Sequence, residues 1–63
     1  MKLKLVEWRR ARNITQDEMA KQLDISKPTY VRWERNPKLI RIDCAYRIAS
    51  IFGVEITDII FLP

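Results

Sequence analysis

Positively charged side chains gather in one short stretch of the chain, where together they could bind a polyanion. Between positions 27 and 41 there is one anion, Glu34, and five cations, Lys27, Arg32, Arg35, Lys38 and Arg41. This stretch carries a net charge of +4, equal to that of the whole 63-residue chain, so the remainder is balanced. A localised positive patch is typical of a surface that meets nucleic-acid phosphates. An ordinary solvated basic surface is the alternative interpretation.

The element that must position these cations is a helix that begins at Lys27. Ser26 caps it, and a proline in its first turn costs little because that amide has no helical partner. Tyr30 and Trp33 lie three positions apart and face inward, so the helix is held by its apolar side. The helix ends near position 35, and its outward face carries Lys27, Pro28, Val31, Arg32 and Arg35.

A preceding helix is joined to this one by a three-residue turn. Thr15 followed by Glu18 forms a capping box, so the preceding helix begins at Gln16 and ends at Leu23. Asp24 takes the turn, because aspartate tolerates the left-handed backbone conformation. A helix held firmly by a neighbour, with cations on its free side, suits the major groove of double-stranded DNA.

The rest of the sequence predicts a single all-α domain over residues 1–63. There is one glycine, Gly53, which ends a helix, and no strand-like alternation of useful length. Thr57 caps a last short turn. Helices are therefore expected at about residues 2–12, 16–23, 27–35 and 41 or 42 to 52, followed by the short turn at 58–61.

No residue pattern points to catalysis or to a metal site. The chain has no histidine and a single cysteine, Cys44, whereas zinc sites are built from several such ligands. It also lacks a glycine-rich phosphate loop and a nucleophile paired with a base. We therefore expect no enzymatic activity, no cofactor and no small-molecule ligand.

The composition favours a cytoplasmic protein. A lone cysteine cannot form an internal disulfide, which fits a reducing compartment. No apolar run approaches the about 20 residues that a membrane span needs. The N-terminal sequence MKLKLVEWRRAR is too charged for a signal peptide, so no membrane partner is expected.

The string TQDEMAKQLDISKPTYVRWE, from Thr15 to Glu34, resembles the helix-turn-helix domain of the lambda-type phage repressors and Cro proteins, the Xre family. The closing pairs Ile48-Ala49 and Phe52-Gly53 also match, so the resemblance covers essentially the whole chain. It implies a lambda-repressor-like bundle of five helices, with the helix-turn-helix at helices two and three. Such proteins bind operator DNA, usually as homodimers, with the third helix as the recognition helix.

The resemblance also implies which residues meet base edges. Lys27, Pro28 and Arg32 match the positions that usually do so, and Val31 matches a neighbouring position on the same face. A phosphate contact and a solvated side chain are the alternatives for Lys27. Arg32 could pair with guanine O6 and N7, which is worth about 1–3 kcal/mol of discrimination; its alternative is a solvated arginine. Pro28 has no donor, so it is limited to apolar contact, for instance with a thymine methyl group.

Other positions match residues that contact phosphates or hold the fold. Gln16 matches a glutamine that usually contacts a phosphate, at a helix N-terminus that attracts anions. Arg9 and Glu34 match a pair that often forms a buried ion bridge between helices one and three. Phosphate contacts are also expected from the basic residues that end the third helix or follow it, Arg35, Lys38 and Arg41.

Three residues depart from the family pattern. Asp24 and Asn36 stand where glycine is usual, and both residue types tolerate the left-handed conformation. Arg41 stands where a serine often caps the fourth helix, which leaves the start of that helix open.

The C-terminal end is more apolar than one short turn can bury. Its large apolar side chains could form the surface of a two-fold dimer, or could simply cap helices one and four. The residues concerned are Ile56, Ile59, Ile60, Phe61 and Leu62.

The leading hypothesis is a sequence-specific, double-stranded-DNA-binding transcriptional regulator of the Cro or small phage-repressor type. It would act by occupying an operator without a ligand, and the short chain favours a phage or prophage origin. The alternative is a protein-interaction module with the same fold, of the antitoxin or anti-repressor type. The cationic third helix argues against that alternative.

Overall fold

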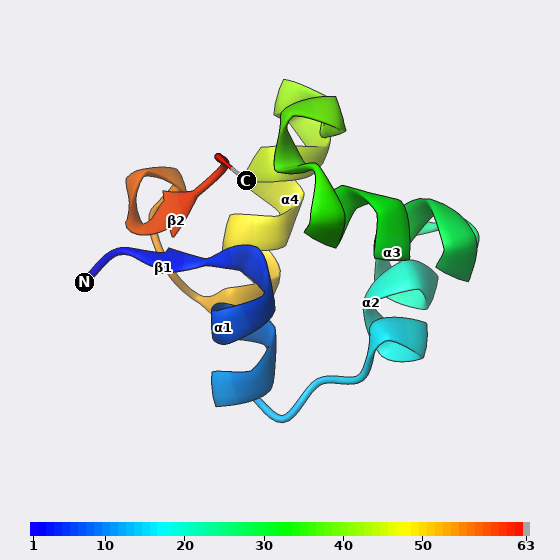
Figure 1. Ribbon diagram of the computed structural model, residues 1–63. Coiled ribbons are helices and arrows are strands. Elements are labelled where there is room, and N and C mark those ends of the chain that lie inside the picture. Colours follow the sequence, from blue (N-terminus) through cyan, green and yellow to red (C-terminus); the bar gives the residue numbers. More distant parts are fainter. Residues whose placement is uncertain (63) are drawn as a thin grey trace.

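The computed structural model describes residues 1–62 and consists mainly of four α-helices (Figure 1). In the view of Figure 1, α2 and α3 lie on the right, the two short strands lie on the left, and α1 and α4 stand between them. The helices are α1 (Leu5–Ala11), α2 (Gln16–Leu23), α3 (Lys27–Arg35) and α4 (Ile42–Phe52). Two 3-10 turns, η1 (Pro37–Leu39) and η2 (Ile56–Asp58), flank α4, and β1 (Leu3–Lys4) pairs with β2 (Ile59–Ile60).

The predicted bounds of α2 and α3 are confirmed, because local hydrogen bonds fix both helix starts. The Thr15 hydroxyl accepts from the Glu18 amide at 3.1 Å, and the Glu18 carboxylate accepts from the Thr15 amide at 3.0 Å. The Ser26 hydroxyl accepts from the Thr29 amide at 3.3 Å. Asp24 takes the left-handed conformation with φ of 57°, so the turn survives without glycine.

The prediction of five helices is wrong: the described residues form four. The expected turn at residues 58–61 is not helical, because η2 ends at Asp58 and the next two residues form β2. Ile59 and its neighbour are β-branched, which favours extended backbone, and they pair in parallel with β1. The same pairing keeps Leu3 extended, so the first helix begins at Leu5 rather than at residue 2.

The hydrophobic core lies between the helix-turn-helix and the α1–α4 side of the molecule. Ala20 is buried where α2 meets α3, and a small side chain there lets the two helices approach closely. Tyr30 and Trp33 are both buried, which confirms that α3 is held by its inner face. The most deeply buried side chains are Leu5, Met19, Leu23, Tyr30, Ile48 and Phe52.

Two arginines outside the basic stretch serve the fold. The Arg12 guanidinium donates to the Phe52 carbonyl at 2.8 Å, and that of Arg47 donates to the Gln22 carbonyl at 3.1 Å. Both acceptors are terminal helix carbonyls that would otherwise lack a partner, and cations there also complement the helix dipole. Arg12 in addition lies over the Trp8 ring, 5.1 Å from its centroid. Part of the chain's positive charge is therefore structural.

Two classes of feature are missing from the described part of the chain. None of its helices combines the length and apolar character needed to cross a membrane. Residues 1–62 also hold no cluster of acidic or cysteine side chains suited to a metal ion.

Candidate nucleic-acid interface

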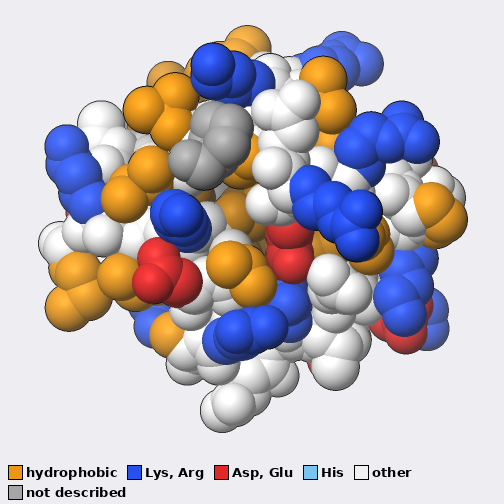
Figure 2. Space-filling view, viewed as in Figure 1, with side chains coloured by type: hydrophobic (Ala, Val, Ile, Leu, Met, Phe, Trp, Pro, Cys, Tyr) orange, Lys and Arg blue, Asp and Glu red, His pale blue; other side chains and the backbone are white. Residues whose placement is uncertain are grey.

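The outward face of α3 presents the residues expected to meet base edges. Lys27, Pro28 and Arg32 are exposed, and Val31 is half-buried beside them. Side chains of lysine and arginine cover much of the surface on the α2–α3 side in Figure 2. The buried inner face of α3 fixes its orientation, and the spacings of one, three and four between these positions place all four on one side of the helix.

The cations of this surface differ in whether they already have a partner. Lys27 Nζ lies 3.5 Å from Asp17 Oδ2, with 52% of the lysine and 62% of the aspartate side chain exposed. Within residues 1–62, Arg32 forms no ion pair with an acidic group. Arg32 therefore presents a guanidinium free to make bidentate contacts, whereas Lys27 must first leave a carboxylate.

The residues expected to contact phosphates also fall into two groups. Arg35 and Lys38 are exposed, and neither pairs with an acidic group in the described part of the chain. Arg41 lies 3.4 Å from Asp43, with both side chains exposed. Arg41 also stands at the N-cap of α4 without a side-chain capping bond, so this helix begins at Ile42 uncapped.

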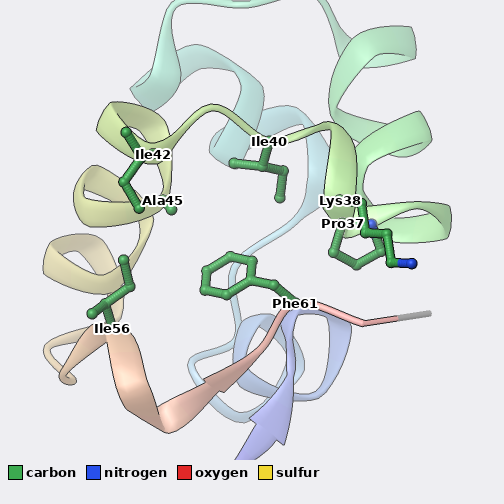
Figure 3. Close-up of a pocket in the computed structure, with 7 residues that line it drawn as sticks. All are labelled: Pro37, Lys38, Ile40, Ile42, Ala45, Ile56 and Phe61. Atoms are coloured by element: carbon green, nitrogen blue, oxygen red, sulfur yellow. The ribbon is translucent and has the colours of Figure 1, made fainter.

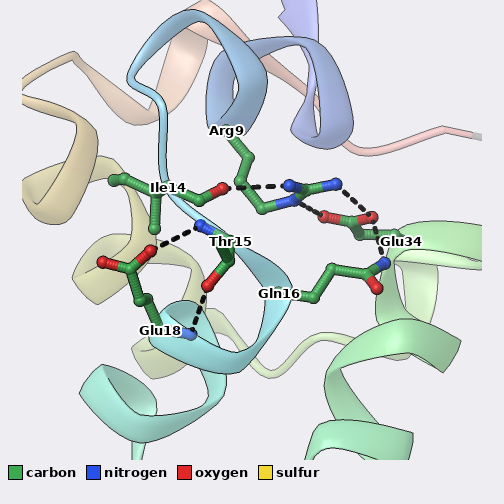
Figure 4. Close-up of polar contacts among 6 residues, drawn as sticks. All are labelled: Arg9, Ile14, Thr15, Gln16, Glu18 and Glu34. Atoms are coloured by element: carbon green, nitrogen blue, oxygen red, sulfur yellow. Dashed lines mark hydrogen bonds and ion pairs between the residues drawn. The ribbon is translucent and has the colours of Figure 1, made fainter.

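Gln16 stands at the start of α2, but its side chain is already engaged. Gln16 Nε2 donates to Glu34 Oε1 at 3.0 Å (Figure 4). An amide nitrogen carries two hydrogens, so one N–H remains for another acceptor. Gln16 thus links the N-terminus of α2 to the C-terminal half of α3.

Glu34 is the centre of a polar cluster that joins α1, α2 and α3 (Figure 4). Arg9 Nε lies 2.5 Å from Glu34 Oε2, and Arg9 Nη2 donates to Glu34 Oε1 at 3.4 Å. Arg9 Nη1 also donates to the Ile14 carbonyl at 2.9 Å. Only 11% of the Arg9 side chain and 8% of the Glu34 side chain are exposed, so this pair is largely removed from water.

The protonation states of this cluster follow from its contacts. Burial alone would raise the pKa of Glu34, but hydrogen bonds from Arg9 and Gln16 outweigh it, and the pKa lies below its ordinary value. The hydrogen bond to Glu34 raises the pKa of Arg9. Burial raises the pKa of the neighbouring Tyr30 well above its ordinary value, so the phenol stays neutral.

The apolar C-terminal residues are divided between the core and the surface. Ile59 is 5% exposed and belongs to the core, which corrects its assignment to a dimer surface. Ile56, Ile60 and Phe61 are half-buried, and Leu62 is exposed. Ile59 is covered because β2 pairs with β1 and turns this side chain inward.

A hollow of about 330 Å³ opens beside this C-terminal segment (Figure 3). In Figure 3 the Phe61 ring lies between Ile56 at the start of η2 and Pro37 at the start of η1, below Ile40. The wall of the hollow is mainly apolar and consists of Pro37, Lys38, Ile40, Ile42, Ala45, Ile56 and Phe61.

A family model described as Helix-turn-helix matches residues 5–59 of this chain. The chain belongs to the Xre-type helix-turn-helix family. An uncharacterized HTH-type transcriptional regulator of Methanocaldococcus jannaschii is 39% identical over 59 residues, which cover 94% of this chain and 89% of that protein. Another uncharacterized HTH-type transcriptional regulator, from Archaeoglobus fulgidus, is 34% identical over 59 residues, which cover 94% of this chain and 83% of that protein. No solved structure matches the chain significantly.

Two features of this helix-turn-helix protein were missed by sequence reasoning. Asp17 was not connected with Lys27, because a carboxylate in a first helical turn is ordinarily explained by the helix dipole. Ile42 and Tyr46 are also exposed, the former to 67%. Their spacing of four placed them together on the outer face of α4, so the sequence did carry a signal for this second apolar surface.

Proposed function

We propose that this helix-turn-helix protein is a sequence-specific, double-stranded-DNA-binding transcriptional regulator that places α3 in the major groove of its operator. Membership of the Xre-type family and two relatives named as transcriptional regulators support a DNA-binding regulator. The observation that carries the proposal is the division of α3 into two faces. Its buried face holds Tyr30 and Trp33, while its free face presents Arg32 without an acidic partner among residues 1–62.

Base recognition falls to the outward face of α3 between residues 27 and 32. Arg32 supplies a bidentate donor pair for guanine O6 and N7, and Lys27 supplies a point charge for a base acceptor. Pro28 and Val31 offer apolar surface to a thymine methyl group. These four side chains share one face, so they read neighbouring base pairs.

Phosphate contacts flank this face and set its register on the duplex. Gln16 offers its second amide hydrogen at the N-terminus of α2, where free backbone amides add to the attraction. The exposed cations at and beyond the end of α3 contact the adjoining backbone, namely Arg35, Lys38 and Arg41.

The operator-bound form is a two-fold dimer through the C-terminal end. Ile56, Ile60, Phe61 and Leu62 leave apolar surface at this end, next to the hollow. Ile42 projects from the rim of the same hollow, so a second copy related by a two-fold axis both supplies and receives apolar side chains. Two recognition helices then meet half-sites about 10 bp apart, and the operator is an inverted repeat.

The decisive experiment is a selection from randomised duplexes at near-physiological salt, followed by sequencing of the retained DNA. We expect an enriched inverted repeat, because a dimer reads the same half-site twice. Arg32→Ala should abolish enrichment at the guanine that this residue reads. The matched control is Arg10→Ala, which removes the same charge from an exposed position on α1. A pool left unenriched, with binding only at low salt, would sink operator recognition by the protein alone.

One observation favours a second function, that of a protein-interaction module of the antitoxin or anti-repressor type. The hollow beside Phe61 is apolar and open, and another protein could occupy it instead of a second copy. Variants of Lys27 and Arg32 distinguish the two functions. A regulator loses its operator when these residues are replaced, whereas an interaction module retains its partner.

Both relatives come from archaea, and the names they carry refer to no phage. The Cro-like mode of action, in which occupancy of a promoter suffices for regulation, is part of the proposal. Phage or prophage origin stays a prediction.

A further inference from the structure

The ion pair between Asp17 and Lys27 joins the two helices of the helix-turn-helix across their N-termini. Asp17 is the second residue of α2, and Lys27 is the first residue of α3. The distance of 3.5 Å between Nζ and Oδ2 brings a carboxylate to the edge of the surface expected to read bases. The pair therefore lies where an approaching duplex would meet both charges.

This position gives Asp17 two effects on DNA binding. It offsets the charge of Lys27, so the two side chains together add no net charge at this end of α3. It also occupies the ammonium group, which must exchange the carboxylate for a DNA acceptor before it can contribute. The pair bridging Arg41 and Asp43 differs, because those residues are two positions apart in one segment and leave α2 and α3 unconnected.

Non-specific and specific complexes make different demands on Lys27. In a non-specific complex, affinity comes almost entirely from phosphate contacts, and each added contact steepens the dependence on salt. In a specific complex, Lys27 faces a base acceptor within the groove. A carboxylate that retains Lys27 outside the groove therefore weakens non-specific binding more than it weakens operator binding.

We propose that Asp17 is a positioning residue for Lys27 and that it increases discrimination between the operator and other DNA. This inference rests on the proposed function, because it assigns Lys27 to a base contact at the operator. Asp17 keeps the ammonium group off the phosphates of random DNA, and the operator displaces it by offering a base acceptor.

The test compares Asp17→Asn with the wild type on the selected operator and on a random duplex, over a series of salt concentrations. We expect affinity for random DNA at low salt to rise about two- to fivefold, the range of one exposed ion pair. The slope of log K against log salt should steepen by about 0.9, the value of one new phosphate contact. Operator affinity should rise less, so the ratio of the two affinities falls.

Glu55→Gln is the matched control, because it changes the net charge equally at the residue before η2, and the segment that holds η2 and β2 lies on the side of the molecule away from α2 and α3 (Figure 1). A second variant pair repeats the comparison in a Lys27→Gln background, where the gain from Asp17→Asn should vanish. A gain that persists without Lys27 would mean direct repulsion of phosphates and would overturn the proposal. A gain no larger than that of Glu55→Gln, or an equal gain on both duplexes, would overturn it as well.

The random-duplex measurement also separates this inference from the proposed function. If the selection enriches no site, operator recognition fails. Asp17 is then tested on random DNA alone. A rise in affinity on Asp17→Asn that depends on Lys27 still supports the restraint of Lys27 by Asp17, whereas the absence of any rise overturns it.

Discussion

The helix-turn-helix and the C-terminal edge are held in different ways. Both bury apolar side chains, but the helix-turn-helix is also fixed by polar contacts: the caps of Thr15 and Ser26, and the cluster centred on Glu34. Apolar burial and a short strand pair fix the second, where Ile59 enters the core beside β1. Polar contacts have strict geometry, which suits a surface that must present side chains in fixed positions. Apolar packing is less directional, which suits a surface that can exchange solvent for another apolar face.

The largest loss of stability is expected where a single charge of the polar cluster is removed. Arg9→Ala leaves the Glu34 carboxylate largely buried without its cation, which should cost about 3–5 kcal/mol of unfolding free energy. Urea denaturation followed by circular dichroism measures the change. The matched control is Arg10→Ala on the exposed face of α1, for which we expect a change within about 0.5 kcal/mol. Equal losses for the two variants would show that the cluster does not stabilise the helix-turn-helix.

A somewhat smaller loss is expected from the apolar edge. Ile59→Ala creates a cavity beneath the strand pair and should cost about 2–4 kcal/mol in the same measurement. Ile60→Ala is the matched control. The Ile60 side chain is next to Ile59 in the chain but only half-buried, so its removal should cost less unfolding free energy. If the order of these two variants were reversed, the assignment of Ile59 to the core and of Ile60 to the surface would be wrong.

A smaller loss of unfolding free energy is expected when acid protonates the polar cluster. The pKa of Glu34 lies below its ordinary value of 4.5, so its contribution is complete above that pH and is lost as pH falls through the folded-state pKa. We expect the unfolding free energy to drop below pH 4.5, and Glu34→Gln to show a shallower drop. Thr15 hydrogen bonds also lower the pKa of Glu18, which keeps titrating in the variant. Parallel pH profiles for the two proteins would contradict the assignment.

The difference between local polar contacts and long-range apolar packing explains how much of the fold could be predicted from the sequence. Caps act between residues close together in the sequence, so Thr15 with Glu18 and Ser26 with Pro28 predicted where α2 and α3 begin. The strand pair joins Leu3 to Ile59, and no local pattern reports a contact between residues so distant in the chain. The C-terminal residues were therefore expected to form a helical turn.

In the candidate site too, local features could be predicted from the sequence and contacts between distant residues could not. The outward face of α3 follows from helical spacing, so its residues were predictable as a set. Their charge partners were not, because the contact of Asp17 with Lys27 depends on how two helix N-termini meet across the turn. The engagement of Gln16 by Glu34 depends on the packing of α2 against α3 in the same way.

The smallest effect on stability is expected from exposed apolar residues at and around the C-terminal segment, on the rim of the hollow and at position 62. These residues also give the sharpest test of the difference between the two regions. The double variant Ile42→Ser and Leu62→Ser should change the unfolding free energy of the monomer by no more than about 0.5 kcal/mol per site, because both side chains are solvated there. Self-association should nevertheless be lost, since these side chains would be buried only between two copies. Sedimentation equilibrium measures the oligomeric state, and binding to a full inverted repeat against a single half-site measures its effect on DNA. Ala11→Ser, at an exposed position ending α1, is the control and should leave both unchanged. A wild type that stays monomeric at high concentration and on the full repeat would reject the dimer, and with it the view that this edge is kept apolar to receive a second copy.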